Sequence, residues 1–430
     1  MDKNTAALTP PMGFNSWDCY GAAINEAQLL ANAAYMQKRL LPYGWEYVVC
    51  DIQWYEPTAQ SCHYHKFADL CMDEYSRLLP AENRFPSAAG GKGFAPIAEK
   101  IHSMGLKFGV HLMRGVPRQA VHRGAATVTP GVTARDIAHP DSLCPWNTDM
   151  YGVDPDAPGA QEYYDSVFAL LAQWGVDYVK VDDIANTEFR PQEPYSAARE
   201  IEMIRRAIDR SGRTMVLSLS PGPAPLSAAA HLKRHANLWR MSGDFWDVPA
   251  ALTKMFGLCA QWYPHVGPGC WPDCDMLPLG TLQLNEPDPR YRARRTRFTE
   301  NEQRSLMNLW CIFRSPLMMG GELTLIDDFT FSLLTNRALL ALDQHSSGNR
   351  PLVSDGEKAI WTCVDGAGRR VFAAFNLKTE PQTVPVETGC TGAYRTLDLW
   401  TNRETPRTAP TLSFPLAPRE SVIFSVIGAR

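Results

Sequence analysis

Short runs of apolar residues alternate with amphipathic stretches over the first three quarters of the chain. The first run is PPMGFNSW (10–17) and the eighth is SPLMMGG (315–321). Nearly continuous apolar runs are typical of strands in a parallel sheet whose outer face is covered by helices. The six runs between them are YVVCDIQW, LKFGVHLM, VDYVKVDD, TMVLSLS, NLWRMSGD and WPDCDML.

The stretches between these runs carry apolar residues at helical spacing. They include EAQLLANAAYMQKRL (26–40), FAPIAEKIHSM (94–104), AQEYYDSVFALLAQW (160–174) and AAREIEMIRRAI (197–208). Such spacing predicts amphipathic helices between the strands. Eight strand and helix units are typical of a closed (β/α)₈ barrel, the TIM barrel. We therefore predict an α/β fold with such a barrel over residues 1–342.

Beyond the predicted barrel the pattern changes to short runs in which apolar and polar residues alternate. Turn residues separate these runs, and no helical stretch lies between them. This pattern is typical of antiparallel strands that bury one face. We predict a C-terminal antiparallel β-sandwich domain over residues 343–430, with a structural role favoured over polysaccharide binding. The runs are AIWTCVDG, RRVFAAFNL, QTVPVE, YRTLDLW and ESVIFSVI.

Bulk composition narrows the class of protein. The 430 residues are 45% apolar and 20% charged, which is ordinary for a globular enzyme. A net charge of −4 gives no electrostatic reason to bind nucleic acid or a membrane surface. The start MDKNTAALTPPMGFNSW lacks the apolar core of a secretory signal, and no run is long enough to span a bilayer. We expect a cytoplasmic protein. The sequence does not decide whether it forms a homo-oligomer.

Eleven cysteines are scattered through apolar segments, which favours reduced thiols over a disulfide framework. Cys259, Cys270 and Cys274, with His265 between them, match no common zinc spacing. We therefore expect no metal site and no cofactor.

Polar or aromatic side chains stand at the ends of most predicted strands. In a barrel, the carboxyl ends of the strands meet at one rim, where active sites lie. A single aspartate there could equally cap the following helix. Convergence of most of these side chains at one rim favours a site. They are Trp17, Asp51, His111, Asp182, Ser220, Asp244 and Asp275.

The run VDYVKVDDI places two opposite charges on one side of a strand. Side chains alternate along a strand, so Lys180 and Asp182 face the barrel interior together. Both would be costly to bury unless they bind each other or a polar ligand. The lysine should keep Asp182 ionised, as a nucleophile or charge-stabilising carboxylate requires. Asp183 should face outward as a helix cap.

A second acid follows the strand in LWRMSGDFWDVP. Arg240 ends the strand, and Asp244 follows after a short turn. Phe245 and Trp246 could raise the pKa of Asp244 and make it a proton donor. Asp247 is a competitor, although it lies where a helix is expected to start. One ionised and one protonated acid at a barrel rim are what glycoside hydrolysis requires.

The motifs resemble glycoside hydrolase family 27, the α-galactosidase family. PPMGFNSWD, SRLLPAENRFPS, LKFGVHL, DYVKVDD, LWRMSGD and WPDCDML follow one another in the family's order, from about Thr9 into the β domain. The resemblance implies a (β/α)₈ barrel, a C-terminal β-sandwich and hydrolysis with retention through a covalent glycosyl-enzyme.

The resemblance also implies roles for individual residues. Asp182 falls on the nucleophile, and Asp244 falls on the acid/base. Trp17 corresponds to the sugar-facing platform, and Asp51 to an acid that holds a ring hydroxyl. The remaining substrate contacts that we expect are Ile52, His111, Lys180, Ser220, Arg240 and Asp275.

One departure from the family pattern changes the expected substrate. The second strand of α-galactosidases ends in two consecutive acids, which hold the 4- and 6-hydroxyls of galactose; here they are Asp51 and Ile52. A β-L-arabinopyranoside has the ring hydroxyls of an α-D-galactoside but lacks the hydroxymethyl branch. Ile52 in the stretch DIQWYEP also resembles β-L-arabinopyranosidases of the same family. We therefore predict removal of terminal β-L-arabinopyranosyl residues from a small carbohydrate substrate, with weaker α-D-galactosidase activity.

Three alternatives remain open at this point. The first is an α-galactosidase. A Schiff-base aldolase would use Lys180, but Asp182 beside it opposes the low lysine pKa which that chemistry needs. A non-catalytic sugar-binding protein would need Trp17 and Asp51 but not a second pair of acids. The segment 56–84 is expected to shape the rim of the pocket.

Overall fold

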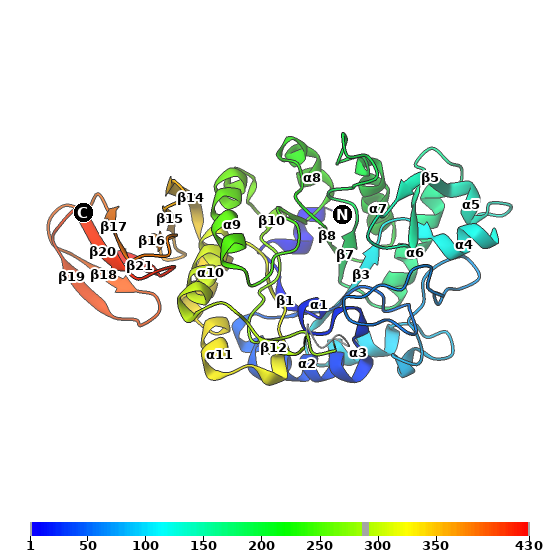
Figure 1. The fold of residues 1–430 in the computed structure, drawn as a ribbon, viewed down its shortest axis with the longest axis horizontal. Coiled ribbons are helices and arrows are strands. Elements are labelled where there is room, and N and C mark those ends of the chain that lie inside the picture. The colour runs from blue at the N-terminus through cyan, green and yellow to red at the C-terminus, as the bar shows by residue number, and fades with distance from the viewer. Residues whose placement is uncertain (1, 286–291, 429–430) are drawn as a thin grey trace.

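The computed structural model describes residues 2–285 and 292–428, and its centre is a parallel sheet of eight strands (Figure 1). The strand order is β10-β9-β8-β7-β3-β2-β1-β13, with every neighbouring pair parallel. Each of the eight predicted runs contains one of these strands. They are β1 (Met12–Asn15), β2 (Tyr47–Cys50), β3 (Lys107–Met113), β7 (Tyr178–Asp182), β8 (Val216–Leu219), β9 (Leu238–Arg240), β10 (Trp271–Asp273) and β13 (Leu317–Met319).

The two outer strands of this sheet meet, which closes it into a barrel. Leu277, just beyond β10, forms a parallel bridge with Met319 in β13. The Leu277 N–H donates to the Met318 carbonyl at 2.7 Å. The predicted (β/α)₈ barrel is therefore confirmed, and the carboxyl ends of all eight strands share one rim.

Helices follow the strands in sequence and surround the sheet (Figure 1). The four predicted helices are confirmed as α2, α3, α6 and α7. Local capping fixes where some of them begin: Asn25 and Gln28 form a reciprocal capping box at the start of α2. The helices are α2 (Glu26–Arg39), α3 (Ala95–Ser103), α6 (Ala160–Gln173), α7 (Ala198–Arg210), α8 (Ala229–His235), α9 (Pro249–Trp262), α10 (Glu300–Phe313), α11 (Asp328–Leu334) and α12 (Arg337–His345).

Short elements in the loops at the strand ends were not predicted. After β3 the chain forms a small three-stranded antiparallel sheet with two short helices. A two-stranded ribbon lies between β10 and α10, and a single helical turn follows β1. These elements are α1 (Trp17–Tyr20), β4 (Val116–Pro117), α4 (Arg118–Arg123), α5 (Ala134–Ile137), β5 (Ala138–Leu143), β6 (Met150–Val153), β11 (Thr281–Leu282) and β12 (Arg294–Arg295).

The C-terminal strands form two antiparallel sheets, as predicted for a β-sandwich. The larger has the order β14-β15-β16-β21-β18-β19, and β17 pairs with β20. Phe372, Phe424, Val384 and Leu412 belong to one apolar cluster between the sheets. The strands are β14 (Ser347–Ser354), β15 (Lys358–Val364), β16 (Arg370–Asn376), β17 (Gln382–Glu387), β18 (Tyr394–Asp398), β19 (Glu404–Arg407), β20 (Thr411–Leu416) and β21 (Ser421–Ile427).

The sandwich packs beside α9, α10 and α11 at one end of the molecule (Figure 1). The Ser305 hydroxyl on α10 donates to the Arg419 carbonyl at 2.7 Å, and the Trp400 indole donates to Asn308 at 3.0 Å. The division of the chain at 342/343 stays a prediction; α12 ends at His345 and β14 begins at Ser347.

None of the eleven cysteines, all of which lie in the described residues, forms a disulfide, and nine of them are buried. Across residues 2–285 and 292–428, no helix combines the length and the apolar character that crossing a membrane requires.

Candidate active site

Asp51, at the carboxyl end of β2, lies at the centre of a buried cluster of polar side chains. Its Oδ2 accepts hydrogen bonds from Lys180 Nζ and Asn15 Nδ2, each at 2.8 Å. Its Oδ1 accepts the Ile52 N–H, also at 2.8 Å. Burial alone would raise the pKa of Asp51, but Lys180 and then His111 outweigh it and lower that pKa. Asp51 is therefore held as a charged hydrogen-bond acceptor.

Lys180 and Asp182 point to the same side of β7, as the alternation predicted. Burial would lower the pKa of Lys180, but Asp51 and Asp182 raise it above its usual value. A lysine held charged in this way is unsuited to Schiff-base chemistry, which argues against the aldolase alternative.

Asp182 receives hydrogen bonds on both carboxylate oxygens. His111 Nε2, in the neighbouring strand β3, lies 3.0 Å from Oδ2, and the Asp183 N–H donates to Oδ1 at 2.9 Å. The cost of burial would raise the pKa of Asp182, but the His111 contact and the Lys180 charge bring it well below the usual value. His111, predicted only as a substrate contact, thus also holds this acid in place and ionised.

A second cluster forms around Arg240 at the end of β9. Arg240 Nη2 lies 2.6 Å from Asp275 Oδ2 and 3.3 Å from Asp244 Oδ1. The Arg240 and Asp275 side chains are 3% and 4% exposed, whereas Asp244 is 58% exposed. Asp244 is therefore the acid of this cluster that solvent and a ligand can reach.

Phe245 does not form the apolar contact expected with Asp244. Phe245 turns away from it and packs against Trp310, with ring centroids 5.1 Å apart. The Phe245 N–H donates to Asp275 at 2.7 Å, which fixes this turn of the chain. Asp244 instead projects into the open beside the guanidinium of Arg240.

The charges of the two clusters interact with each other and with the phenol of one tyrosine, Tyr64. Burial raises the pKa of the Tyr64 phenol well above its usual value, and the charges of Asp182, Asp51 and Asp244 raise it further. Asp182 also adds to the stabilisation of the charged Arg240 guanidinium. Because such interactions weaken with distance, the two clusters lie near each other at the barrel rim.

Three aromatic rings pack against one another near these clusters. Trp17 begins α1 and stacks on Tyr64 at a centroid distance of 6.0 Å and an interplanar angle of 17°. Tyr64 in turn lies 5.8 Å from Trp146. Tyr64 belongs to the segment 56–84 that was expected to shape the rim, but its contacts with Trp17 and Trp146 were not predicted.

Arg84 anchors the same segment to the barrel. Its guanidinium donates to the carbonyls of Gln53, Glu56, Ala22 and Ile24 at 2.5–2.8 Å. One buried side chain thereby joins the loops that follow β1 and β2.

Ile52 follows Asp51 directly and is 1% exposed. The next residue, Gln53, has a left-handed backbone with φ 61°. Gln53 Nε2 and the Tyr55 hydroxyl donate to Asp149 Oδ2 at 2.9 and 3.0 Å, which fixes the turn after Ile52. The position of the isoleucine beside Asp51 is therefore set by buried polar contacts.

Ser220 follows β8, and its buried hydroxyl has no hydrogen-bond partner among the described residues. Its backbone N–H donates to the Val181 carbonyl at 2.8 Å, which places it next to the end of β7.

Asp18 was missed by the sequence reasoning, although it follows Trp17 in MGFNSWD. It is buried, and burial followed by the charges of Asp275 and Asp244 raises its pKa well above the usual value. It packs against Gly320, where an added Cβ would lie 2.0 Å from Asp18 Oδ2. The signal for this contact in the sequence is the pair of glycines that ends SPLMMGG, since Gly320 is the residue that Asp18 packs against.

Asp183 is not the cap of a helix. It is buried with a left-handed backbone (φ 55°), and its Oδ2 lies 2.8 Å from Arg114 Nη2. Asp247 precedes α9 and is buried in an ion pair with Arg294, which removes it as a competitor of Asp244.

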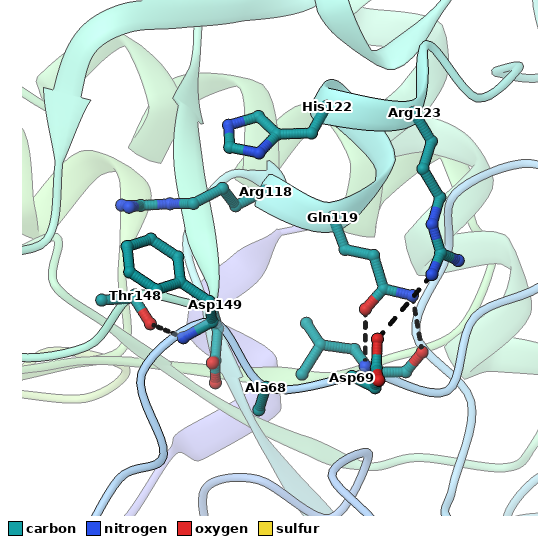
Figure 2. Close-up of a pocket in the computed structure, with 10 residues that line it drawn as sticks. Ala68, Asp69, Arg118, Gln119, His122, Arg123, Thr148 and Asp149 are labelled. Atoms are coloured by element: carbon teal, nitrogen blue, oxygen red, sulfur yellow. Dashed lines mark hydrogen bonds and ion pairs between the residues drawn. The ribbon is translucent and has the colours of Figure 1, made fainter.

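A separate pocket of about 190 Å³ lies between the segment 56–84 and α4 (Figure 2). Arg118, Gln119, His122 and Arg123 project into it from α4, and Arg123 approaches Asp69. None of the predicted site residues lines this pocket, so it is distinct from the two acid clusters.

Comparisons with known proteins identify the family of the chain. The family model described as Alpha galactosidase A matches residues 152–345. A β-L-arabinopyranosidase of family 27 from Geobacillus stearothermophilus is 51% identical, with a TM-score of 0.96 over 100% of this chain and 98% of that one. A putative α-N-acetylgalactosaminidase from Bacillus halodurans is 48% identical, with a TM-score of 0.88 over 98% of each chain.

Among curated proteins, Alpha-galactosidase 3 of Arabidopsis thaliana is 26% identical over 94% of this chain and 78% of its own length. With the barrel, the sandwich and the acid clusters in place, the chain belongs to glycoside hydrolase family 27, the α-galactosidase family, and is a glycoside hydrolase.

Proposed function

We propose that this glycoside hydrolase removes terminal β-L-arabinopyranosyl residues and cleaves α-D-galactosides more weakly. The observation that carries the proposal is the pair of residues at the end of β2, a charged Asp51 followed by the buried Ile52. Asp51 supplies an acceptor for a ring hydroxyl that both sugars share. Ile52 offers only carbon where a hydroxymethyl branch would need a polar partner.

The size of the expected bias follows from this difference. A hydrogen bond to a charged group contributes about 1.5–3 kcal/mol. A galactoside forgoes that bond at Ile52, and its branch must also fit against the side chain, where one extra carbon group changes binding by about 1–3 kcal/mol. The same ring hydroxyls remain held, so galactoside cleavage is weakened and not abolished.

The names of the relatives support the same class of substrate. The Geobacillus protein that is 51% identical is a β-L-arabinopyranosidase, and a variant of it was solved in complex with arabinose. The relatives named α-galactosidases are about half as similar, at 26% identity for the Arabidopsis protein. The α-galactosidase alternative rests on these more distant relatives.

We assign the chemistry to Asp182 and Asp244, with retention of configuration. Ionised Asp182 attacks the anomeric carbon and forms a glycosyl ester while the bond to the leaving oxygen breaks. Asp244 gives its proton to that oxygen. A water molecule then attacks the same carbon, Asp244 takes the proton from the water, and Asp182 is released as a carboxylate.

The other residues at the rim hold the sugar in this scheme. Trp17 lies against the C–H face of the ring, and Lys180 and Asp51 bind ring hydroxyls. Arg240 and Ser220 lie at the ends of β9 and β8, where they can meet the remaining hydroxyls. Asp275 keeps Arg240 in place through the 2.6 Å ion pair.

The test of the substrate is the ratio of kcat/KM for nitrophenyl β-L-arabinopyranoside to that for nitrophenyl α-D-galactopyranoside. We expect a ratio well above one in the wild-type enzyme. Ile52→Asp should move the ratio toward the galactoside by about 10- to 150-fold, from the energies above.

Two further variants serve as controls. Ile52→Val keeps the apolar surface and should keep the preference for the arabinoside. Ile52→Asn adds a neutral polar group and replaces Ile52→Asp if a second acid beside Asp51 prevents folding. A wild-type preference for the galactoside would overturn the proposed substrate. Covalent labelling by a mechanism-based inhibitor that persists in Asp182→Ala would overturn the assigned nucleophile.

A further inference from the structure

We propose that Glu202, His231 and His235 form a binding site for a divalent transition-metal ion of the Zn²⁺ type. Glu202 lies on α7, and both histidines lie on α8. The two helices lie side by side in the layer outside the barrel (Figure 1). The site is separate from the acid clusters, so it does not depend on the proposed function.

The spacing of the three residues fits one ion. His231 and His235 are four residues apart on a helix, which places both rings on the same face. One ligand atom from each residue can be chosen so that all three lie within 4.8 Å of one another. Two ligands of a tetrahedral Zn²⁺ at about 2.1 Å lie about 3.4 Å apart, so small side-chain rotations suffice.

The existing contacts orient the ligand atoms toward each other. His231 Nε2 lies 3.0 Å from Glu202 Oε1, and the two imidazole centroids are 4.4 Å apart. No hydrogen bond to either ring nitrogen of His235 is formed within the described part of the chain. Two imidazoles and one carboxylate are a ligand set that Zn²⁺, Cu²⁺ and Ni²⁺ all accept.

A neighbouring hydroxyl supports the first ligand. Tyr195 Oη lies 2.9 Å from His231 Nδ1, so it can accept that N–H and leave Nε2 to bind a metal. Tyr195 lies in the segment that joins β7 to α7. A bound ion would therefore link that segment to both helices.

Nearby cations limit the expected affinity. Arg206 Nη1 lies 3.9 Å from Glu202 Oε2, but its Nε is engaged at 2.9 Å by Gln161 Oε1. Arg234 stands between the histidines in sequence and is exposed. Both charges oppose a divalent ion, and all three ligands are partly exposed. We expect binding in the micromolar range.

The test is calorimetric titration of the chelator-treated full-length enzyme with Zn²⁺. We expect one ion per chain, a rise in Tm of about 2–5 °C at saturation, and loss of affinity of at least about tenfold in His235→Ala and in Glu202→Gln. Co²⁺ in place of Zn²⁺ should give the visible absorption of a four- or five-coordinate site without thiolate ligands.

His122→Ala is the control, because His122 is an exposed histidine on a helix that has no second histidine one helical turn away. It should bind Zn²⁺ as the wild type does. Circular dichroism without metal checks that each variant is folded. The proposal is overturned if the wild-type enzyme binds no ion, or if His235→Ala and Glu202→Gln bind as tightly as the wild type, which would place the ion elsewhere.

Discussion

Replacing Lys180 with methionine tests the electrostatic basis of the site most directly. The substitution keeps the length and apolar stem of the side chain and removes its charge. Asp51 then loses the ion pair at 2.8 Å and retains the Asn15 amide and the Ile52 N–H. Asp182 loses a cation that helps to lower its pKa.

The magnitude follows from the burial of this pair. The side chains of Lys180 and Asp51 are 12% and 2% exposed, and breaking such a buried pair costs about 3–5 kcal/mol. The two remaining hydrogen bonds keep Asp51 partly satisfied, so we take the lower part of that range. If the substitution reduces the stabilisation of the transition state by about 3–4 kcal/mol, kcat/KM falls by about 10²–10³-fold.

The pH dependence should change in a defined direction. Lys180 lowers the pKa of both Asp51 and Asp182, and both must be ionised in the proposed mechanism. Without it both pKa values rise, so the acid limb of kcat/KM moves to higher pH. The low pKa values of Asp51 and Asp182 stabilise the folded enzyme above about pH 4. During acidification, the Lys180→Met variant should lose this contribution at a higher pH than the wild type does.

The assay is kcat/KM for nitrophenyl β-L-arabinopyranoside across the acidic and neutral range, with unfolding followed by circular dichroism. Lys107→Met is the control, since the Lys107–Glu46 pair is 43% and 37% exposed and should contribute little. A folded Lys180→Met enzyme with an unmoved acid limb would refute the reasoning, even if its rate were lower.

Two further outcomes are expected. Asp244→Ala should lose about 10²–10⁴-fold in kcat/KM on substrates with poor leaving groups and much less on dinitrophenyl glycosides, with azide restoring turnover; equal losses on both would contradict its role as proton donor. Gly320→Ala should lower Tm, because its Cβ would lie 2.0 Å from Asp18 Oδ2. Gly257→Ala in α9 meets nothing within 4 Å and should be neutral or stabilising by up to about 1 kcal/mol.

The barrel could be predicted because its strands are buried on both sides. Such strands must be apolar along their length, and a polar side chain near the end of one marks the rim. All eight strands and the positions of Asp51, Asp182 and Asp275 followed from that rule. Strand β14 was missed because SGNRPLVS is largely exposed and has no apolar run.

The parts of the site that could not be predicted depend on contacts between distant segments. Tyr64 and Trp17 meet between two loops, after β2 and after β1, which Arg84 and the Ala22–Ser61 backbone hydrogen bond join. Phe245, which was expected beside Asp244, turns away, and its N–H donates to an acid at the end of the next strand. Nothing in the order of residues within one loop specifies such partners.

Lys180 and Arg240 are cations at a site where, in the proposed mechanism, positive charge develops on the sugar. Their pairing with acids explains how the site tolerates them. Each cation is already held by a carboxylate: Lys180 by Asp51, and Arg240 by Asp275. In the proposed mechanism, each cation binds a hydroxyl while it stays paired with its acid. The first contacts of Asp182 are His111 and a backbone N–H, and neither is a lysine or an arginine. In the proposed mechanism, the negative charge of Asp182 stabilises the positive charge that develops in the transition state.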